Sequence, residues 1–297
     1  MKTITVEAMA KINLGLDVLR RRADGYHEVK MVMQTVKLYD TLVLSAKAEP
    51  GITIRVDHKE LPTDGNNLIA RAAGILYEEY SIPEGVEISL TKRIPIAAGM
   101  AGGSTDAAAT LVGMNRLFHL GCSEERLKEL GVTIGADVPY CIRGGTMLSE
   151  GIGERLTALS AVPEAFLVIA KPEINVSTKY VYENLHANRL TSHPDIDGMV
   201  RAIRQKDLAG IAEKMENVLE TVTQKEYPII SRLKELLKEE GALNALMSGS
   251  GPTVFGIFSE KEKAEAAWER VKNSGLAPQC FCTTFASGAQ IVTGEKE

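Results

Sequence analysis

The sequence has 297 residues, of which 44% are hydrophobic and 25% are charged, a balance typical of globular proteins and a length that suggests about two domains. The formal net charge of −5 argues against nucleic acid as a partner, because nucleic-acid-binding surfaces are basic. No apolar run reaches the roughly 18–20 residues that cross a membrane, and four cysteines and five scattered histidines form neither a disulfide scaffold nor a zinc site, so we expect free thiols in the cytoplasm.

Strand patterns dominate the first half of the chain. Alternation near the N-terminus predicts one apolar strand face, formed by Ile12, Leu14, Leu16 and Val18. The opposite face then carries Lys11, Asn13, Gly15 and Asp17. Further strands are expected over residues 31–36, 41–46, 52–56 and 86–95, and a helix capped by Asp64 or a neighbouring asparagine is expected over residues 63–80.

A glycine-rich stretch, PIAAGMAGGSTDAAA, follows the last of these strands over residues 95–109 and lacks the GK[ST] ending of a P-loop. Gly102 and Gly103 would let backbone N–H groups approach a ligand closely. The helix expected after them, with its first turn at Ser104 or Thr105, would point unpaired N–H groups at the same place. The stretch therefore predicts an anion site, with Asp106 interpreted as a helix-start residue and not as a base. A tight turn capped by Ser104 is the alternative.

Helices and strands alternate in the rest of the chain. A helix is expected over residues 123–131, with Ser123 as its N-cap and Gly131 as its end, and a mixture of loop and strand over residues 134–154. Beyond residue 160 the patterns predict strands over 165–172, 243–258 and 279–285, and helices over 177–185, 207–220, 227–241 and 259–275. Helices on one face of an antiparallel sheet indicate an α+β domain.

Three strings in this order resemble the motifs of the GHMP kinases: AKINLGLDVL at residues 10–19, the glycine-rich stretch, and LMSGSGPTVFGIF at residues 246–258. The resemblance implies a two-domain α+β kinase fold, with a ribosomal-protein-S5-like domain over residues 1–158 and a ferredoxin-like α+β domain over residues 159–297. It also implies ATP as the phosphoryl donor, with Mg²⁺ carried by the nucleotide and no metal held by the protein alone. The residues expected around the ATP phosphates are Pro95, Ile96, Ala97, Ala98, Gly99, Met100, Ala101, Gly102, Gly103, Ser104 and Thr105.

The string RRADGYHE at residues 21–28 resembles one branch of this family, in which the 2-hydroxyl of 4-diphosphocytidyl-2-C-methyl-D-erythritol is phosphorylated for isoprenoid synthesis. By resemblance Asp137 is the catalytic base and Lys11 its partner, and a nearby ammonium favours the carboxylate form of an aspartate. If the two residues do not act together, Asp137 would be a helix cap and Lys11 a solvated lysine on a strand.

The same resemblance implies the residues that bind the acceptor with its cytidine diphosphate group: Asn13, Tyr26, His27, Thr178, Tyr182, Gly249 and Ser250. Tyr26, His27 and Tyr182 are expected at the cytosine. Tyr180 is the less favoured alternative to Tyr182, which could instead be a core residue. Asn66 and Lys92 are weakly implied near the adenine.

Three other functions stay open at this point. A homoserine or mevalonate kinase of the same family is disfavoured by RRADGYHE. A nucleotide or sugar sensor without turnover is disfavoured by the presence of both Lys11 and Asp137. An RNA-associated protein is disfavoured by the acidic net charge. The protein is expected to be a monomer or a homodimer.

Overall fold

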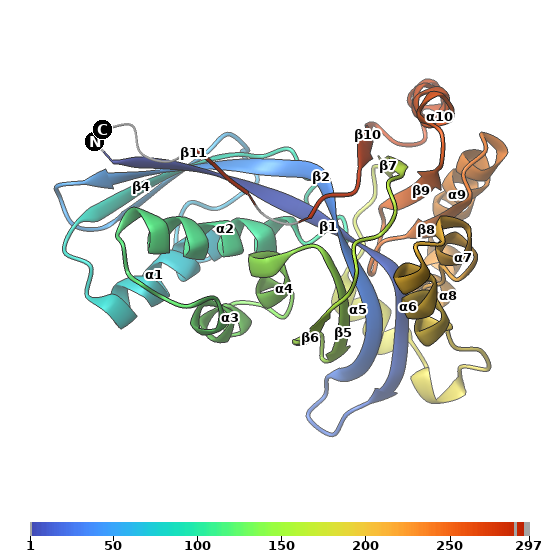
Figure 1. Ribbon diagram of the computed structural model, residues 1–297, viewed down its shortest axis with the longest axis horizontal. Coiled ribbons are helices and arrows are strands. Elements are labelled where there is room, and N and C mark those ends of the chain that lie inside the picture. Colours follow the sequence, from blue (N-terminus) through green and yellow to red (C-terminus); the bar gives the residue numbers. More distant parts are fainter. Residues whose placement is uncertain (1, 288–289, 294–297) are drawn as a thin grey trace.

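The computed structural model describes residues 2–287 and 290–293, and it places two groups of strands and helices next to each other along the long axis (Figure 1). The N-terminal group is built on a sheet with the strand order β11-β1-β2-β4-β3, to which β5 adds beside β2 and β6 beside β5. β3 is parallel to β4, and the other pairs are antiparallel. The strands are β1 (Thr3–Arg21), β2 (His27–Lys47), β3 (Ile52–Val56), β4 (Gly85–Thr91), β5 (Thr146–Gly151), β6 (Arg155–Ala158) and β11 (Gln290–Thr293).

β1 and β2 form a long hairpin, in which β2 pairs with β4 near one end and with β5 near the other. β2 pairs with β4 over residues 41–47 and with β5 over residues 29–34, so the two strands expected in this region are one continuous strand. The pairing of β1 with β2 shifts register between Asn13 and Gly15. A β-bulge of this kind reverses the alternation of faces.

The bulge makes one expectation wrong: the four apolar residues of β1 do not share a face. Ile12 and Leu14 pack in one core cluster, whereas Leu16 and Val18 pack in the other. Because of the same shift, Leu16 lines the cavity described below together with Lys11.

Four helices cover one face of the N-terminal sheet: α1 (Leu68–Tyr80), α2 (Gly102–Leu117), α3 (Glu124–Val132) and α4 (Val138–Arg143). Asn67 caps α1 and Ser123 caps α3, as expected. α3 continues past Gly131, and α4 occupies a region in which only loop and strand were expected. α2 begins at Gly102, earlier than expected, and Ala101 precedes it in a left-handed conformation without a side-chain cap.

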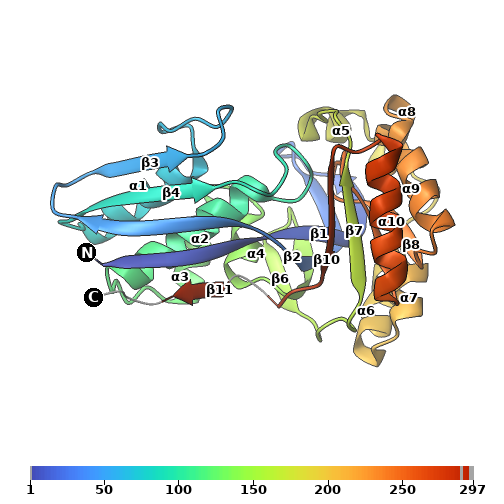
Figure 2. The ribbon, with the colours of Figure 1, turned by 90° about the horizontal axis from the view of Figure 1, so that it is seen from above.

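The C-terminal group is an antiparallel sheet with the order β10-β7-β9-β8 and helices on its outer face, which confirms the α+β prediction (Figure 2). Its strands are β7 (Phe166–Lys171), β8 (Asn244–Met247), β9 (Val254–Phe258) and β10 (Gln279–Thr284). Its helices are α5 (Thr178–Asn184), a short 3-10 helix (Ala187–Arg189), α6 (Ile196–Gln205), α7 (Leu208–Glu213), α8 (Glu220–Glu226), α9 (Ile229–Glu239) and α10 (Lys261–Ser274). The single helix expected over residues 207–220 is wrong, because α7 ends at Glu213 and Asn217 forms a turn before α8.

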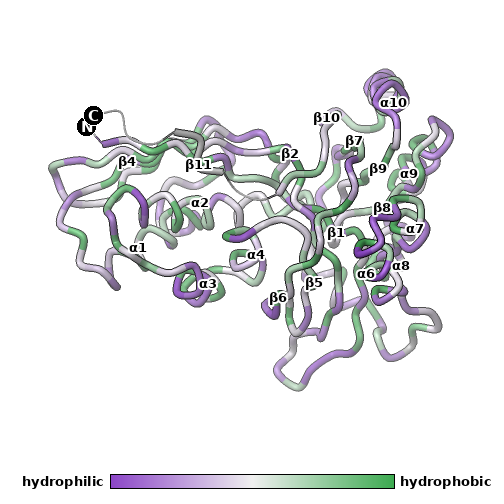
Figure 3. The backbone as a smooth tube through the Cα atoms, viewed as in Figure 1, coloured by the Kyte–Doolittle hydropathy of each residue, from purple (hydrophilic) through white to green (hydrophobic). Residues whose placement is uncertain are grey.

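Two hydrophobic clusters hold these layers together. The larger lies between each sheet and its covering helices, and the smaller joins the other face of β1 and β2 to the inner face of the C-terminal sheet and to α6 and α7. Figure 3 shows hydrophilic residues along α3, α10 and the turn between β1 and β2, all of which lie on the outside. The smaller cluster therefore fixes the two groups relative to each other. Within the described residues, no helix has the length and apolar character needed to span a membrane.

Candidate active site

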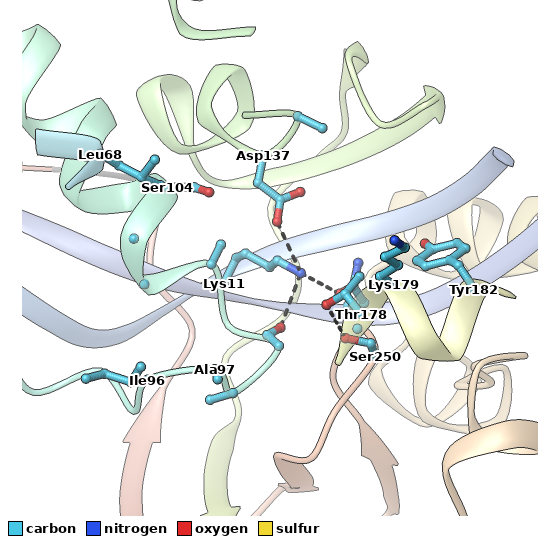
Figure 4. A pocket seen from close by; sticks show the side chains of 18 of the residues that line it. Lys11, Leu68, Ile96, Ala97, Ser104, Asp137, Thr178, Lys179, Tyr182 and Ser250 are labelled. Carbon is cyan, nitrogen blue, oxygen red and sulfur yellow. Dashed lines mark hydrogen bonds and ion pairs between the residues drawn. The ribbon is translucent and has the colours of Figure 1, made fainter. Parts of the chain in front are cut away.

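A cavity of about 860 Å³ lies where the two groups of elements meet. Its wall is formed by β1, the segment that follows the β1–β2 turn, the glycine-rich stretch with the start of α2, the turn before α4, α5, and the turn between β8 and β9 (Figure 4). Nearly all the residues expected at the site line it: Lys11, Asn13, Tyr26, His27, Pro95, Ile96, Ala97, Ala98, Gly99, Ala101, Gly102, Gly103, Ser104, Asp137, Thr178, Tyr182, Gly249 and Ser250.

Lys11 and Asp137 meet at the centre of this wall, although they come from β1 and from the turn before α4. Lys11 is 5% exposed, and its Nζ lies 3.9 Å from Asp137 Oδ2 (Figure 4). The same Nζ donates hydrogen bonds to Asn13 Oδ1 at 2.7 Å and to the Gly99 carbonyl at 3.3 Å. Asp137 occupies the N-cap position of α4, but its side chain makes no capping hydrogen bond. The carboxylate is therefore turned toward the lysine and the cavity, not toward its own helix.

The glycine-rich stretch contributes the floor of one half of the cavity. Ala97 and Ala101 adopt positive φ angles of 50° and 59°, a conformation that costs a non-glycine residue of order 1–3 kcal/mol and that concentrates at functional sites. The Ser104 side chain lines the cavity and forms no hydrogen bond to the described residues. Met100 and Thr105, by contrast, are buried beneath the stretch, and the Thr105 hydroxyl donates to the Met9 carbonyl. The Thr105 hydroxyl is thus held by the fold and does not face a ligand.

The two consecutive glycines have a packing role in addition to the expected one. A Cβ on Gly102 would lie 3.0 Å from Lys92 Nζ, and one on Gly103 would lie 3.3 Å from Leu68 Cδ1. Such distances are tighter than ordinary van der Waals contact, so the missing side chains make room for Lys92 and Leu68 at the cavity wall.

The β8–β9 turn closes the cavity from the C-terminal side. Ser248 Oγ donates to the Gly99 carbonyl at 2.9 Å, which ties this turn to the glycine-rich stretch. Gly249 has a φ of 56°, and Ser250 Oγ lies 2.8 Å from Thr178 Oγ1 of α5. Three segments distant in sequence are therefore hydrogen-bonded to one another around the Lys11 ammonium.

Aromatic rings gather at the far end of the cavity. The rings of His27 and Tyr182 lie 5.1 Å apart between centroids, and Tyr26 beside them is 60% exposed. Burial, with a smaller contribution from the Arg21 cation, lowers the pKa of His27, so its imidazole is neutral at pH 7 and offers one donor and one acceptor. Tyr180, on the same helix as Tyr182, lies outside the cavity lining and donates to Glu226. Of the two tyrosines considered for this end, Tyr182 is the one at the cavity.

The wall of the nucleotide half holds a buried cluster of charges. Asn66 and Lys92 both line the cavity. Asp106 was expected at the start of the helix, and this is wrong because α2 begins at Gly102, which places Asp106 in its second turn. There Asp106 is 3% exposed, and it accepts a hydrogen bond from Lys92 Nζ at 2.7 Å.

The sequence patterns of two known protein domains match this chain in the expected order. Residues 67–145 match the family described as GHMP kinases N terminal domain, and residues 199–276 match that described as GHMP kinases C terminal. A curated protein of Lachnoclostridium phytofermentans is 51% identical over 98% of this chain and 100% of its own length. The chain belongs to the GHMP kinase family. It is therefore an ATP-dependent kinase of a small molecule, as its motifs predicted.

Two relatives of this GHMP kinase carry the same name. The protein of Lachnoclostridium phytofermentans, and one of Lachnospira eligens that is 51% identical over 95% of this chain and 98% of its own, are called 4-diphosphocytidyl-2-C-methyl-D-erythritol kinase. A crystal structure of 4-(cytidine 5'-diphospho)-2C-methyl-D-erythritol kinase superimposes with a TM-score of 0.83, at 30% identity, over 96% of this chain and all of the other. A homoserine kinase from Cytophaga hutchinsonii reaches a TM-score of 0.81 over 98% of both chains, but at 21% identity this shows the shared fold alone.

Asn217 is a supporting residue of this GHMP kinase that the sequence did not single out. It is 2% exposed, and its amide nitrogen donates to the carbonyls of Met247 and Gly249, both at 2.8 Å. Its amide oxygen accepts from the Leu219 backbone at 3.0 Å. One side chain therefore satisfies three buried backbone groups and holds the β8–β9 turn in place. The one signal was a lone asparagine within a pattern interpreted as helix, since asparagine is unfavourable inside helices and favours caps and turns.

Replacing Asn217 with Ala should destabilise the fold by about 2–3 kcal/mol, because each buried backbone group left unpaired costs about 1–3 kcal/mol and relaxation recovers part of the sum over the three groups. Urea unfolding measures this as a lower midpoint with an unchanged slope. Asn184→Ala is a matched control, since Asn184 donates only to Tyr180 in its own exposed helix. Equal stability of both variants would show that Asn217 does not support the turn.

Proposed function

We propose that this GHMP kinase transfers the γ-phosphoryl group of ATP to the 2-hydroxyl of 4-diphosphocytidyl-2-C-methyl-D-erythritol. The observation that carries the proposal is the placement of the Lys11–Asp137 pair between a glycine-rich anion site and an aromatic end suited to a nucleobase. Relatives at 51% identity over nearly the whole chain bear the name of this kinase, which supports the same acceptor.

The nucleotide phosphates would lie over the first turn of α2. Its unpaired backbone N–H groups and the positive end of its dipole attract a polyphosphate. The Ser104 hydroxyl faces the cavity and has no hydrogen-bond partner among the described residues, so it is available to a phosphate oxygen. Bound Mg²⁺ would supply charge neutralisation to the phosphates.

The acceptor would span the other half. Tyr182 and Tyr26 offer faces for the cytosine, and the neutral His27 can donate to and accept from its edge. Thr178 and Ser250, whose hydroxyls are hydrogen-bonded to each other, would meet the groups between base and alcohol. The methylerythritol end then reaches Asp137, which accepts the hydroxyl proton as the oxygen attacks phosphorus. The Lys11 ammonium stabilises the negative charge on the transferred group.

ADP release from ATP and Mg²⁺ in the presence of single acceptors tests the proposal. Release with the cytidine compound, at a kcat/KM well above that with homoserine or mevalonate, is the expected result. A preference for homoserine or mevalonate would assign the enzyme to another branch of its family. Binding of the cytidine compound without ADP release would make the protein a sensor. Either outcome would overturn the proposal.

Tyr182→Ala should raise the KM for the cytidine acceptor about tenfold, because stacking of a base on an aromatic ring is worth about 1–3 kcal/mol. The KM for ATP should stay the same, since Tyr182 lies at the opposite end of the cavity from the glycine-rich stretch. Tyr180→Ala is the matched control on the same helix, with a side chain that points to Glu226. Steady-state kinetics with each substrate varied in turn measure the effect; an equal rise for both variants would contradict the placement of the base.

A further inference from the structure

Two carboxylates share one ammonium behind the nucleotide half of the cavity. Lys92 Nζ lies 2.5 Å from Asp40 Oδ2 and 2.7 Å from Asp106 Oδ2, and the three side chains are at most 5% exposed. They come from β2, from the segment after β4 and from the second turn of α2. Lys92 and Asp106 also line the cavity, and Lys92 Nζ packs directly against Gly102.

The hydrogen bonds of the two carboxyl groups differ. Asp40 Oδ1 accepts from the backbone N–H groups of Arg93 and Ile94, so both oxygens of Asp40 have donors. Asp106 Oδ1 is buried and has no hydrogen-bond partner among the described residues. If both groups were ionised, the cluster would hold a net negative charge in a buried site with one carboxylate oxygen unpaired, an arrangement that costs several kcal/mol. A proton on Asp106 lowers that cost, because a neutral carboxyl group is cheaper to bury than a carboxylate.

The electrostatic surroundings agree with this assignment. Burial raises the pKa of Asp106 to about 8, with Lys92 opposing the rise and Asp40 adding to it. Burial also opposes the charge of Lys92, but Asp106 and Asp40 outweigh it and the pKa of Lys92 lies above its ordinary value. Burial raises the pKa of the Cys141 thiol in α4 well above the usual range, with a small contribution from Asp106, so this thiol stays neutral.

We propose that Asp106 is a positioning residue for the nucleotide, which carries a proton in the resting protein and holds Lys92 against the glycine-rich stretch, and that loss of this proton weakens nucleotide binding. The inference rests on the proposed nucleotide site. Asp106 ionises as the pH rises, and the new negative charge lies one turn behind the N–H groups that face the phosphates. Like charges repel, so affinity is present below the pKa of Asp106 and falls above it.

Binding of Mg²⁺–ATP to the full chain, measured by calorimetry without any acceptor, tests the inference. The wild-type affinity should fall about fivefold to tenfold between pH 7 and pH 9, as expected for one added charge at close range in a partly screened site. Asp106→Asn, which is neutral and of the same shape, should bind about as tightly as wild type at pH 7 and should abolish the fall toward pH 9. Asp106→Leu should bind weakly at both pH values, because it leaves Lys92 without this partner.

A second readout does not depend on binding. The infrared band of a protonated carboxylic acid should be present at pH 7, fade toward pH 9, and be absent in Asp106→Asn. The same fall of affinity in wild type and Asp106→Asn, or an Asp106→Asn variant that binds as weakly at pH 7 as Asp106→Leu, would overturn the inference. Wild-type protein that shows the pH-dependent binding but releases no ADP with any acceptor would overturn the proposed function and leave this inference standing.

Discussion

Asp137→Asn should lower kcat by about 10³-fold, toward the upper part of the range of 10²–10⁴ that general acid–base catalysis contributes. Asparagine has the shape of aspartate but cannot accept the hydroxyl proton. Asp137 makes no capping hydrogen bond in α4, and the one ion pair that it forms with the described residues, to Lys11, is long at 3.9 Å. The substitution therefore removes little that holds the fold or the ground-state complex together, and KM for both substrates should stay within about threefold.

The measurement is ADP release at saturating ATP and acceptor, together with the thermal midpoint of unfolding of each variant. Asp197→Asn is the matched control: it changes an exposed aspartate that pairs with Lys30, and neither residue lines the cavity. It should leave kcat and the midpoint unchanged, because exposed ion pairs are worth about 0–1 kcal/mol. Turnover of Asp137→Asn within a few fold of wild type would mean that another group accepts the proton.

The sequence predicted most elements correctly where one periodicity ran without interruption. The alternation over the first six residues of β1, the caps Asn67 and Ser123, and the two strands around the glycine turn all follow from local chemistry. The errors lie where tertiary contacts decide. The bulge between Asn13 and Gly15 moves the apolar side chains of β1 from one hydrophobic cluster to the other, and the end of α7 depends on Asn217 reaching the β8–β9 turn.

The site shows the same division. Resemblance named the residues, but spacing alone could not bring Lys11 to Asp137 across more than a hundred residues. It also could not distinguish Ser104 from Thr105, which are neighbours with similar hydroxyls. The helix starts at Gly102, so Ser104 faces the cavity while Thr105 turns inward to Met9. The burial of Asp106 follows from the same start, since the four helical residues before it place Asp106 in the second turn, where its side chain is buried.

Lys11→Met should lower kcat by about 10²–10³-fold, the loss typical of removing one group that stabilises charge in the transition state. Methionine keeps the length and apolar body of the side chain, so the change removes mainly the ammonium. That ammonium is 5% exposed and joins Asn13, the Gly99 carbonyl and Asp137. Its loss leaves the buried Asn13 Oδ1 without this donor, whereas the Gly99 carbonyl keeps Ser248 Oγ, so stability should fall by about 1–3 kcal/mol.

Kinetics of the double variant Lys11→Met/Asp137→Asn separate the two contributions. If Lys11 acts on the same step as Asp137, the double variant should be only slightly slower than Asp137→Asn, because groups that work as a unit are far from additive. Lys30→Met is the matched control, a lysine of β2 whose partner Asp197 is exposed, and it should keep full turnover. A multiplicative loss in the double variant would instead assign Lys11 to the binding of phosphate alone, independent of proton transfer.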